Sequence, residues 1–339
     1  MLVSVVMPVF NGGDFLCEAI ESVLKQTFRD FEFLIINDGS TDASLSVIQK
    51  YQSLDGRIKV ISRPNKGLVA SLNEGIDVAV GKYIARMDAD DICLPTRFEE
   101  QVNLLENNLS VGVCGSWVEV FGENMRCSVM RQPFSMAEML PNLLFSVCFA
   151  HPSVMIRVDA LNLVKIPYDP NYISVEDYEL WTRLRYKTKF ANIQKVLLRY
   201  RYIETSVSRL ADSEGGDNRF KRVKSVFSKE LDALGVVNNI DEDFLHFIVA
   251  SNERLGANRI DIRELANYFE KLHDANKSMN LYSLRYLFRV LCRKYLVATF
   301  YQFKLQPLSI ISSIRSRLFY VGVYNFVLEV SCQVISKKL

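Results

Sequence analysis

The sequence predicts an α/β protein: a mostly parallel, doubly wound sheet with helices on both faces, followed by a C-terminal helical region. Strand and helix signals alternate along the first 120 residues, which is the pattern of consecutive β-α-β units. Polar clusters follow four of these strands, at the end of such sheets where ligands bind. The chain has 339 residues, 49% of them hydrophobic, so it is long enough for about two domains with a sizeable core.

The elements of the first 120 residues follow in order. Continuous apolar runs predict strands at 3–9, 31–37, 57–62, 82–87 and 112–122. Apolar residues at helical spacing predict helices at 15–26, 40–51, 67–80 and 96–108. Ser40, Thr41 and Asp42 are typical residues for the start of the second helix. Pro95 suits the first turn of the fourth.

The remaining chain is less regular at first and then helical. Strands are predicted at 151–157 and 196–202, with an amphipathic helix at 176–186 between them. From about residue 211 the pattern is helical and increasingly aromatic and basic. Residues 277–339 carry ten Lys and Arg against one acid, a net charge of +9, which leaves −7 for residues 1–276. This asymmetry predicts that the basic region meets an anionic surface.

Cysteine usage and hydropathy bear on the compartment. The seven cysteines are scattered without a C-x-x-C pair, which fits a reducing compartment. The apolar N-terminus lacks a basic leader region and is expected to be a strand rather than a signal peptide. No apolar run reaches the length of a spanning helix. We therefore expect a cytoplasmic protein, peripheral at the inner face of the plasma membrane.

The sequence places three aspartates directly after the apolar run 82–85. Asp88, Asp90 and Asp91 would repel one another there unless a cation compensates their charge. Carboxylates at a strand end can converge on Mg²⁺ or Mn²⁺, which prefer oxygen ligands. The alternative is a solvated acidic loop that precedes the next helix, and short motifs alone do not exclude it.

Other clusters point to a nucleotide, although its common fingerprints are absent. Neither G-x-G-x-x-G nor G-x-x-x-x-G-K-[ST] occurs. Asp38 follows the second strand, and an acid can accept the imide N–H of a uracil. Arg63 and Lys66 follow the third strand, where basic side chains can meet phosphates. A nucleoside diphosphate bound through a metal would use all of these groups.

These ordered motifs resemble the catalytic domain of family 2 glycosyltransferases, which has the GT-A fold. The resemblance covers residues 2–120 and resumes at 151–157 and from 175 to about 208; its motifs include "SVVMPVFNGG", "IINDGSTD", "NKGLVASLN", "GKYIARMDADD", "HPSVMIR" and "VEDYELW". Within the family the chain most resembles bacterial β-1,3-N-acetylglucosaminyl- and related hexosyltransferases that build lipooligosaccharide, O-antigen or capsule. It implies a GT-A catalytic domain at 1–210, with a nucleotide-binding half (1–120) and an acceptor half (121–210), and a basic helical region at 211–339.

The resemblance also implies residue roles. Donor binding would involve Pro8, Val9, Asn11 and Asp38 at uracil and ribose, Arg63 and Lys66 near the base or diphosphate, Asp88 at the ribose or a metal-bound water, and Asp91 at the sugar. Asp90 would be the main ligand of Mn²⁺ or Mg²⁺, with Asp88 beside it. Asp177 would be the catalytic base, supported by Glu176. The donor would be a UDP-sugar, and the acceptor a glycan or lipid-linked glycan.

The acceptor side is less defined by the sequence. His151, Trp181 and Arg201 are candidates there, while a packing role is the alternative for both rings. Family members often carry a His two residues after the arginine that matches Arg201, but this chain has Ile203. This departure leaves a third protein ligand of the metal in doubt. Asp177 itself has a simpler reading, an acid favoured by the dipole at a helix N-terminus.

Three function classes remain in view. The first is an inverting glycosyltransferase, in which one carboxylate deprotonates the acceptor hydroxyl and no protein nucleophile is needed. The second is a non-catalytic nucleotide-sugar-binding protein on the same fold. The third, a nucleotidyltransferase, lacks its Gly-rich N-terminal loop here.

The basic tail either lies on an anionic membrane or packs on the protein or a second subunit. Nucleic acid is not an expected partner, because the rest of the chain is acidic.

Overall fold

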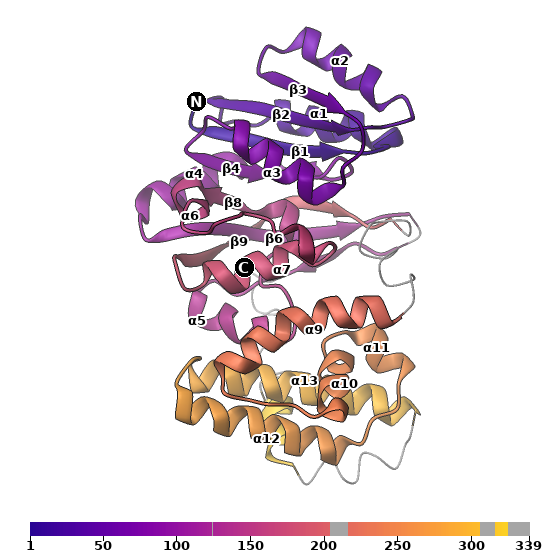
Figure 1. The fold of residues 1–339 in the computed structure, drawn as a ribbon, viewed down its shortest axis with the longest axis vertical. Helices are drawn as coiled ribbons and strands as arrows, with labels where there is room; N and C mark the ends of the chain where they lie inside the picture. Colours follow the sequence, from indigo (N-terminus) through magenta and orange to yellow (C-terminus); the bar gives the residue numbers. More distant parts are fainter. Residues whose placement is uncertain (124, 204–215, 306–315, 325–339) are drawn as a thin grey trace, which may run out of the picture. The chain divides into compact units, whose positions relative to one another are not determined.

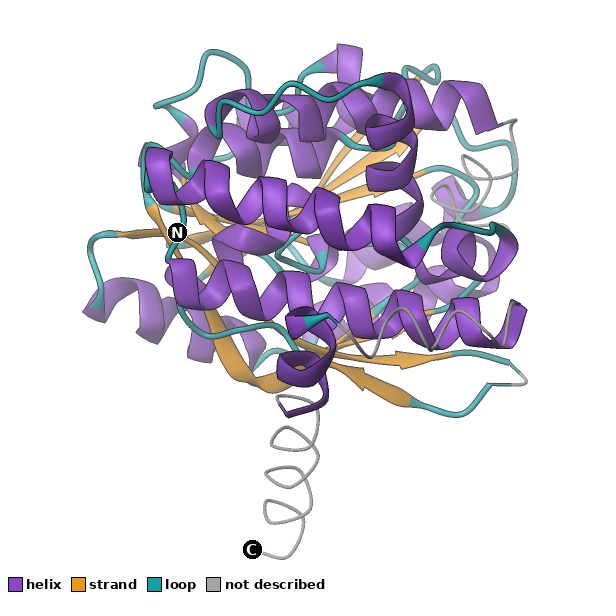
Figure 2. Ribbon diagram, turned by 90° about the horizontal axis from the view of Figure 1, so that it is seen from below, coloured by secondary structure: helices purple, strands orange, loops and turns teal. Residues whose placement is uncertain are grey.

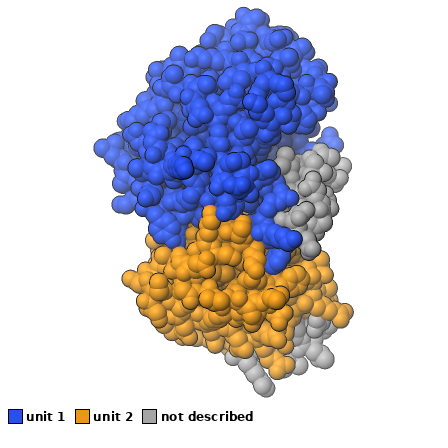
Figure 3. All heavy atoms as spheres, viewed as in Figure 1, with its two compact units in different colours: residues 1–136, 147–222 blue, residues 137–146, 223–339 orange. Residues whose placement is uncertain are grey.

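The computed structural model describes residues 1–123, 125–203, 216–305 and 316–324. The last residues of the predicted acceptor half (204–210) and much of the basic tail (306–315 and 325–339) lie outside the described residues. The chain divides into two compact units: residues 1–136 with 147–222, and residues 137–146 with 223–339 (Figure 3). The domain boundary at residue 210 stays a prediction.

The described part of the first unit holds a nine-stranded sheet (Figure 1). The strands are β1 Val3–Val9, β2 Phe31–Asp38, β3 Ile58–Arg63, β4 Tyr83–Arg86, β5 Ile92–Cys93, β6 Val111–Phe121, β7 Ser128–Met130, β8 Met155–Arg157 and β9 Lys189–Arg201. Their order is β3-β2-β1-β4-β8-β6-β9-β5, and β7 pairs with β6. β3, β2, β1 and β4 are parallel neighbours, as are β6 and β9. β5, β7 and β8 pair antiparallel.

Helices cover both faces of this sheet. They are α1 Leu16–Leu24, α2 Ser44–Leu54, α3 Leu68–Val78, α4 Arg97–Asn107, α6 Val158–Leu161 and α7 Glu176–Leu184, while α5 Met136–Met139 lies almost wholly in the second unit. Side chains alternate along β1, so Val5 and Met7 join one core with α1, α2 and α4. Val6 faces the other way, under α3, where Gly75 permits a close approach: a Cβ there would lie 2.5 Å from Val6 Cγ1. The predicted α/β class with a doubly wound sheet is confirmed.

One predicted helix start differs from the structure. The hydroxyl and acid at 40–42 suggested that the helix begins there, but α2 begins at Ser44. Ser40 and Thr41 are held instead by the end of β1: Asn11 N donates to Ser40 Oγ (3.0 Å), and Thr41 N donates to Asn11 Oδ1 (2.8 Å). A long-range contact of the loop therefore outweighs the local capping signal.

The second unit consists of helices and loops in its described part, since every assigned strand falls in the first unit (Figure 2). Its helices are the later part of α9 (Gly216–Ala233), α10 Ile240–Val249, α11 Asn252–Ala257, α12 Ile262–Met279 and α13 Leu284–Leu305. His246 is fully buried, stacks on Phe145 (ring centroids 4.7 Å apart), and lies 2.5 Å from the Leu144 carbonyl oxygen. Residues 137–146 thus contribute to this core. Among the described residues, no helix is long and apolar enough to cross a membrane.

Candidate functional site

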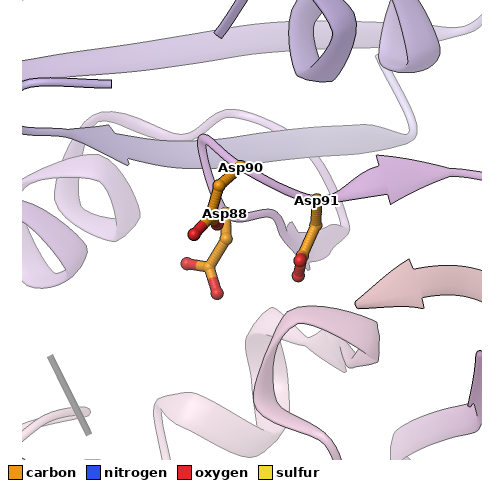
Figure 4. Close-up of side chains that lie close together, drawn as sticks. All are labelled: Asp88, Asp90 and Asp91. Atoms are coloured by element: carbon orange, nitrogen blue, oxygen red, sulfur yellow. The ribbon is translucent and has the colours of Figure 1, made fainter. Parts of the chain in front are cut away.

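The turn between β4 and β5 gathers the three predicted aspartates. One carboxylate oxygen from each of Asp88, Asp90 and Asp91 lies within 4.8 Å of the other two. Figure 4 shows all three side chains projecting to the same side of the turn. Because β4 ends at Arg86 and β5 begins at Ile92, the turn is short and fixed at both ends by sheet pairing. The structure therefore brings together the residues that the sequence predicted as a cation site.

The charge of this cluster is only partly compensated by the protein, through the ion pair of Asp88 with Arg86. Burial raises the pKa of Asp90 to about 6, and Asp88 adds to the rise. The pKa of Asp91 lies well above its ordinary value, through burial and then its two acidic neighbours. Asp91 is 0% exposed, yet its Oδ2 has no hydrogen-bond partner. A buried, unpaired carboxylate oxygen beside two more carboxylates fits a hard divalent cation, so these residues suit Mn²⁺ or Mg²⁺.

Arg201 holds the aspartate turn in place through two hydrogen bonds. Its backbone N donates to Asp91 Oδ1 (2.8 Å), and its Nε donates to the Asp90 carbonyl (2.8 Å). The guanidinium also pairs with Glu18 and lies 4.2 Å from the Phe15 ring centroid. The sequence placed Arg201 on the acceptor side, whereas its contacts in the structure are with the cation turn and the start of α1.

The carboxyl ends of β1, β2 and β3 are neighbours in the sheet, as the parallel order requires. Asp38 at the end of β2 is 3% exposed and pairs in register with Arg63 at the end of β3. Its carboxylate forms an ion pair with Arg63 and accepts bonds from Lys66 N (2.7 Å) and Gly67 N (2.9 Å). Gly67 has φ +88°, which favours glycine. Asp38 thus shapes the loop before α3, with the Lys66 side chain exposed on it.

The end of β1 adds a further group of predicted donor residues. Pro8 is half-buried and Val9 is buried. Asn11 has φ +51° and ties this end to the β2–α2 loop through its side chain. Between them lies Phe10, a residue that the sequence analysis did not single out, with 53% of its surface exposed. Its signal in the sequence is its position directly after the first strand, between Val9 and Asn11.

A second acidic pair stands at the start of α7. Asp177 is half-buried, and its Oδ1 accepts a bond from Tyr178 N (2.7 Å). Glu176 is 5% exposed, and its Oε2 has no hydrogen-bond partner. Burial raises the pKa of Glu176 to about 7, and Asp177 adds to the rise. Just before them Ser174 has φ +68°, an uncommon conformation that tends to mark functional turns.

The hydroxyl of Tyr168 lies within the electrostatic influence of both acidic groups. It is 2.8 Å from His151 Nε2, and Tyr168 is 1% exposed. Burial raises the pKa of Tyr168, and the carboxylates of Asp177, Glu176 and Asp88 raise it further. Carboxylates of the aspartate turn and of the start of α7 thus both raise the pKa of the same buried side chain, although the sequence separates them by almost ninety residues.

Asn73 on α3 fixes the Tyr168 segment. Its amide pairs with the Tyr168 backbone in both directions, at 3.0 Å to the nitrogen and 2.7 Å to the carbonyl oxygen. Burial, together with the charge of Arg86, lowers the pKa of His151 well below its usual value, so the ring is neutral. Trp181 is 0% exposed and packs edge-on against Phe149. His151 and Trp181 therefore support the site from within the protein.

Comparisons with known proteins find related sequences and a related fold. A model described as glycosyl transferase family 2 matches residues 4–162, which include the aspartate turn but end before α7. An uncharacterized glycosyltransferase of Haemophilus influenzae is 31% identical over 75% of this chain and 83% of its own. The O-antigen biosynthesis glycosyltransferase WbnJ of Escherichia coli is 32% identical over 62% of this chain and 83% of its own.

A solved structure extends the likeness of fold to almost the whole chain. Residues 1–349 of S. aureus TarS, in complex with UDP-GlcNAc, superpose with a TM-score of 0.59 at 17% identity. The match covers 91% of this chain and 92% of that one. At this identity the likeness concerns the fold.

Proposed function

Because this chain belongs to family 2 of the glycosyltransferases and has the GT-A fold, we propose that it transfers a hexose or N-acetylhexosamine from a UDP-sugar. The acceptor would be a hydroxyl of a growing bacterial surface glycan (lipooligosaccharide, O-antigen or capsule). The transfer would invert the configuration at the anomeric carbon. One observation carries the proposal: carboxylate oxygens of Asp88, Asp90 and Asp91 lie within 4.8 Å of one another, and a separate acidic pair, Glu176 and Asp177, stands in the first turn of α7. A single displacement needs such an arrangement, with a site for the leaving diphosphate and a base on the acceptor side.

The donor would lie across the carboxyl ends of β1 to β4. TarS was solved with UDP-GlcNAc, and WbnJ is named for O-antigen biosynthesis, which favours a UDP-sugar and a surface glycan. Pro8, Val9 and Asn11 would line the uracil and ribose. Phe10 adds an exposed ring on which a base can stack. Asp38 would reach the base from the loop that it shapes.

The phosphates and the transferred sugar would be held farther along the same edge. Lys66 and Arg63 supply positive charge near the base or diphosphate. Asp90, with Asp88, would hold Mn²⁺ or Mg²⁺, and Asp91 would orient the sugar through its unpaired Oδ2. The cation, when bound, supplies charge that stabilises the departing diphosphate. Arg201 would act by keeping the turn in place.

Asp177 would be the catalytic base. Its carboxylate takes the proton of the acceptor hydroxyl, the hydroxyl oxygen bonds to the anomeric carbon, and the bond from that carbon to the diphosphate oxygen breaks to release UDP. Glu176 would support it from the buried side of the turn. His151 and Trp181 would form part of the supporting wall toward the acceptor, since both lie against Tyr168 or its neighbours.

The C-terminal region would bring the enzyme to lipid-linked acceptors. Phe300 and Phe303 of α13 are 57% and 43% exposed, and Lys304 lies over the Phe300 ring, with Nζ 4.7 Å from the centroid. Exposed aromatic and basic residues together suit an anionic membrane surface. We therefore place the enzyme at the inner face of the plasma membrane, with packing on a second subunit as the alternative.

The proposal is tested by turnover and binding with a panel of UDP-sugars and Mn²⁺. One UDP-hexose or UDP-N-acetylhexosamine should raise the melting temperature and be consumed with release of UDP when acceptor glycan is present. A panel of GDP-sugars is the control. No shift with any UDP-sugar, beside a clear shift with a GDP-sugar, would contradict the donor assignment. Binding without any turnover would favour the non-catalytic alternative.

A further inference from the structure

The proposed cation site contains a buried positive charge that the sequence analysis did not single out. Arg86, the last residue of β4, is 5% exposed, and its guanidinium is ion-paired with Asp88. Its Nε is buried without a hydrogen-bond partner in the described part of the chain. Since burying a charge is costly unless it is paired, the acidic cluster is what compensates Arg86 at this position.

A neighbouring arginine shows the contrast. Arg97 is 0% exposed, and its Nη2 donates to the carbonyls of Arg86 (2.8 Å) and Val154 (3.1 Å). Its Nε donates to Gln101 Oε1 (3.0 Å). Arg97 is thus satisfied by neutral acceptors that fix the end of β4, whereas Arg86 has an acidic partner. At the same strand end, the guanidinium of Arg97 therefore fixes the backbone, whereas that of Arg86 pairs with an aspartate.

The charge of Arg86 reaches beyond Asp88. Burial raises the pKa of Asp90 and Asp91, their acidic neighbours add to the rise, and Arg86 opposes it at both. The same opposition acts on Glu176, whose pKa burial and Asp177 raise. Arg86 also lowers the pKa of Tyr168, His151 and Tyr200. Arg86 therefore opposes the rise in pKa of carboxyl groups in both the aspartate turn and the first turn of α7.

We propose that Arg86 is the resident counter-ion of the aspartate cluster and competes with the divalent cation for Asp88. The inference rests on the proposed function, because it requires a cation at this cluster. A cation held by Asp88 and Asp90 would sit beside a buried guanidinium, and the two like charges repel. The negative charges of a diphosphate offset that repulsion. The free enzyme should therefore bind the cation weakly and the nucleotide-bound enzyme tightly.

The experiment measures Mn²⁺ binding to the full chain by electron paramagnetic resonance of the free ion, with and without UDP. Arg86→Gln should bind Mn²⁺ alone about tenfold more tightly than wild type, since the repulsion is gone. The additional gain from UDP should shrink by a similar factor. Arg86→Lys, which keeps the charge, and Arg97→Gln, which removes a buried guanidinium that has neutral partners, should both behave as wild type.

The outcomes separate the inference from the proposed function. A folded Arg86→Gln variant whose Mn²⁺ affinity equals or falls below that of wild type would overturn the inference alone. A wild-type enzyme that binds no Mn²⁺, with or without UDP, would overturn the cation site and the inference with it. If Arg86→Gln is unfolded without metal, recovery of its circular dichroism spectrum in millimolar Mn²⁺ would support the inference, because the ion replaces the lost charge. Failure to recover, while Arg86→Lys folds, would count against it.

Discussion

Asp177 combines partial exposure with a place in the first turn of α7, so its carboxylate is both accessible and held in position. Asp177→Asn should lower kcat by roughly 10²- to 10⁴-fold, the usual contribution of a general base, with little change in donor affinity. Steady-state kinetics with the preferred UDP-sugar measure both quantities. Asp241→Asn is the matched control, because it removes an acid from the first turn of α10. Full activity of Asp177→Asn would refute the base assignment.

Glu176 carries a stability prediction with a definite sign. An acid whose pKa rises on folding, here from 4.5 to about 7, binds its proton more tightly in the folded state. Below pH 4.5 it has no effect on stability; between pH 4.5 and about 7 it progressively lowers the free energy of unfolding, and above that range the loss is complete. Without metal, Glu176→Gln should therefore be more stable than wild type at pH 8, by on the order of 2 kcal/mol, and equal to it near pH 4.

Urea unfolding at the two pH values measures this difference. Glu179 is the matched control because it is 1% exposed on the same helix but ion-paired with Arg183, at 2.7 Å. Glu179→Gln should lose stability at pH 8. A Glu176→Gln variant that is less stable than wild type at pH 8 would show that the carboxylate is compensated in the folded protein.

Individual residues were predictable where a motif or a strand end marks them. The aspartates of the turn and the acids of α7 stand in such places. Arg86 has no comparable signal in the sequence, because a basic residue inside an apolar run is also compatible with a strand at the edge of the sheet. Trp181 and Arg201 were named for the acceptor side, yet tertiary contacts give Trp181 a fully buried position and Arg201 a partner in Asp90. The contact of Arg201 spans 111 residues, and those of Trp181 with Phe149 and His151 also join separate elements, so neither leaves a local pattern.

At the level of elements, the close packing of α3 on β1 depends on Gly75. Gly75→Ala would place a Cβ 2.5 Å from Val6 Cγ1 and force α3 away from the sheet. We expect a loss of about 1–3 kcal/mol in the free energy of unfolding, the usual cost of overpacking. Denaturant unfolding measures it. Gly56→Ala is the control, since nothing lies within 4 Å of its Cβ position; equal effects at both sites would contradict the packing argument.

The elements of the parallel half were predicted well, and β8 falls within the strand predicted at 151–157, whereas the short antiparallel strands β5 and β7 were not predicted. β1 to β4 are apolar runs bounded by polar turns, a pattern visible in the sequence. β5 has two residues and β7 three, so neither has a periodicity to detect. Their pairing with β9 and β6 depends on chain segments that are distant in sequence. The order of the second half of the sheet was therefore beyond prediction.

For the whole molecule, the C-terminal charge and exposed aromatic residues predict reversible binding to anionic membranes. The full chain should co-sediment with phosphatidylglycerol vesicles at low salt, and 0.5 M NaCl, about a fourfold shorter screening length than at 0.03 M, should release it. Replacing Phe300 and Phe303 by Ala should weaken binding several-fold. Phe134→Ala, which removes an aromatic side chain with 56% exposure from the first unit, is the control.

Vesicles of phosphatidylcholine, which carry no net charge, distinguish electrostatic binding from nonspecific adhesion to lipid. Equal co-sedimentation with these neutral vesicles would contradict the electrostatic explanation. A concentration-dependent dimer that the Phe300 and Phe303 substitutions abolish, without any vesicle binding, would favour packing on a second subunit instead.

For the whole molecule, the sequence predicted the fold class but not the division of the chain into its two units. Alternating signals gave the α/β class, and the comparisons confirm the family. No sequence signal marks residues 137–146 as part of the second unit, because their contacts with His246 are made about one hundred residues later.

This division into units determines which segments of the enzyme can be exchanged for those of a relative. Since residues 137–146 belong with 223–339, the chain passes from one unit to the other three times. A hybrid that takes only its C-terminal helices from a relative would pair a foreign His246 position with the native Leu144 and Phe145. Exchanging the two segments together keeps that core intact. The natural module for transplantation is therefore discontinuous, and a single crossover point cannot deliver it.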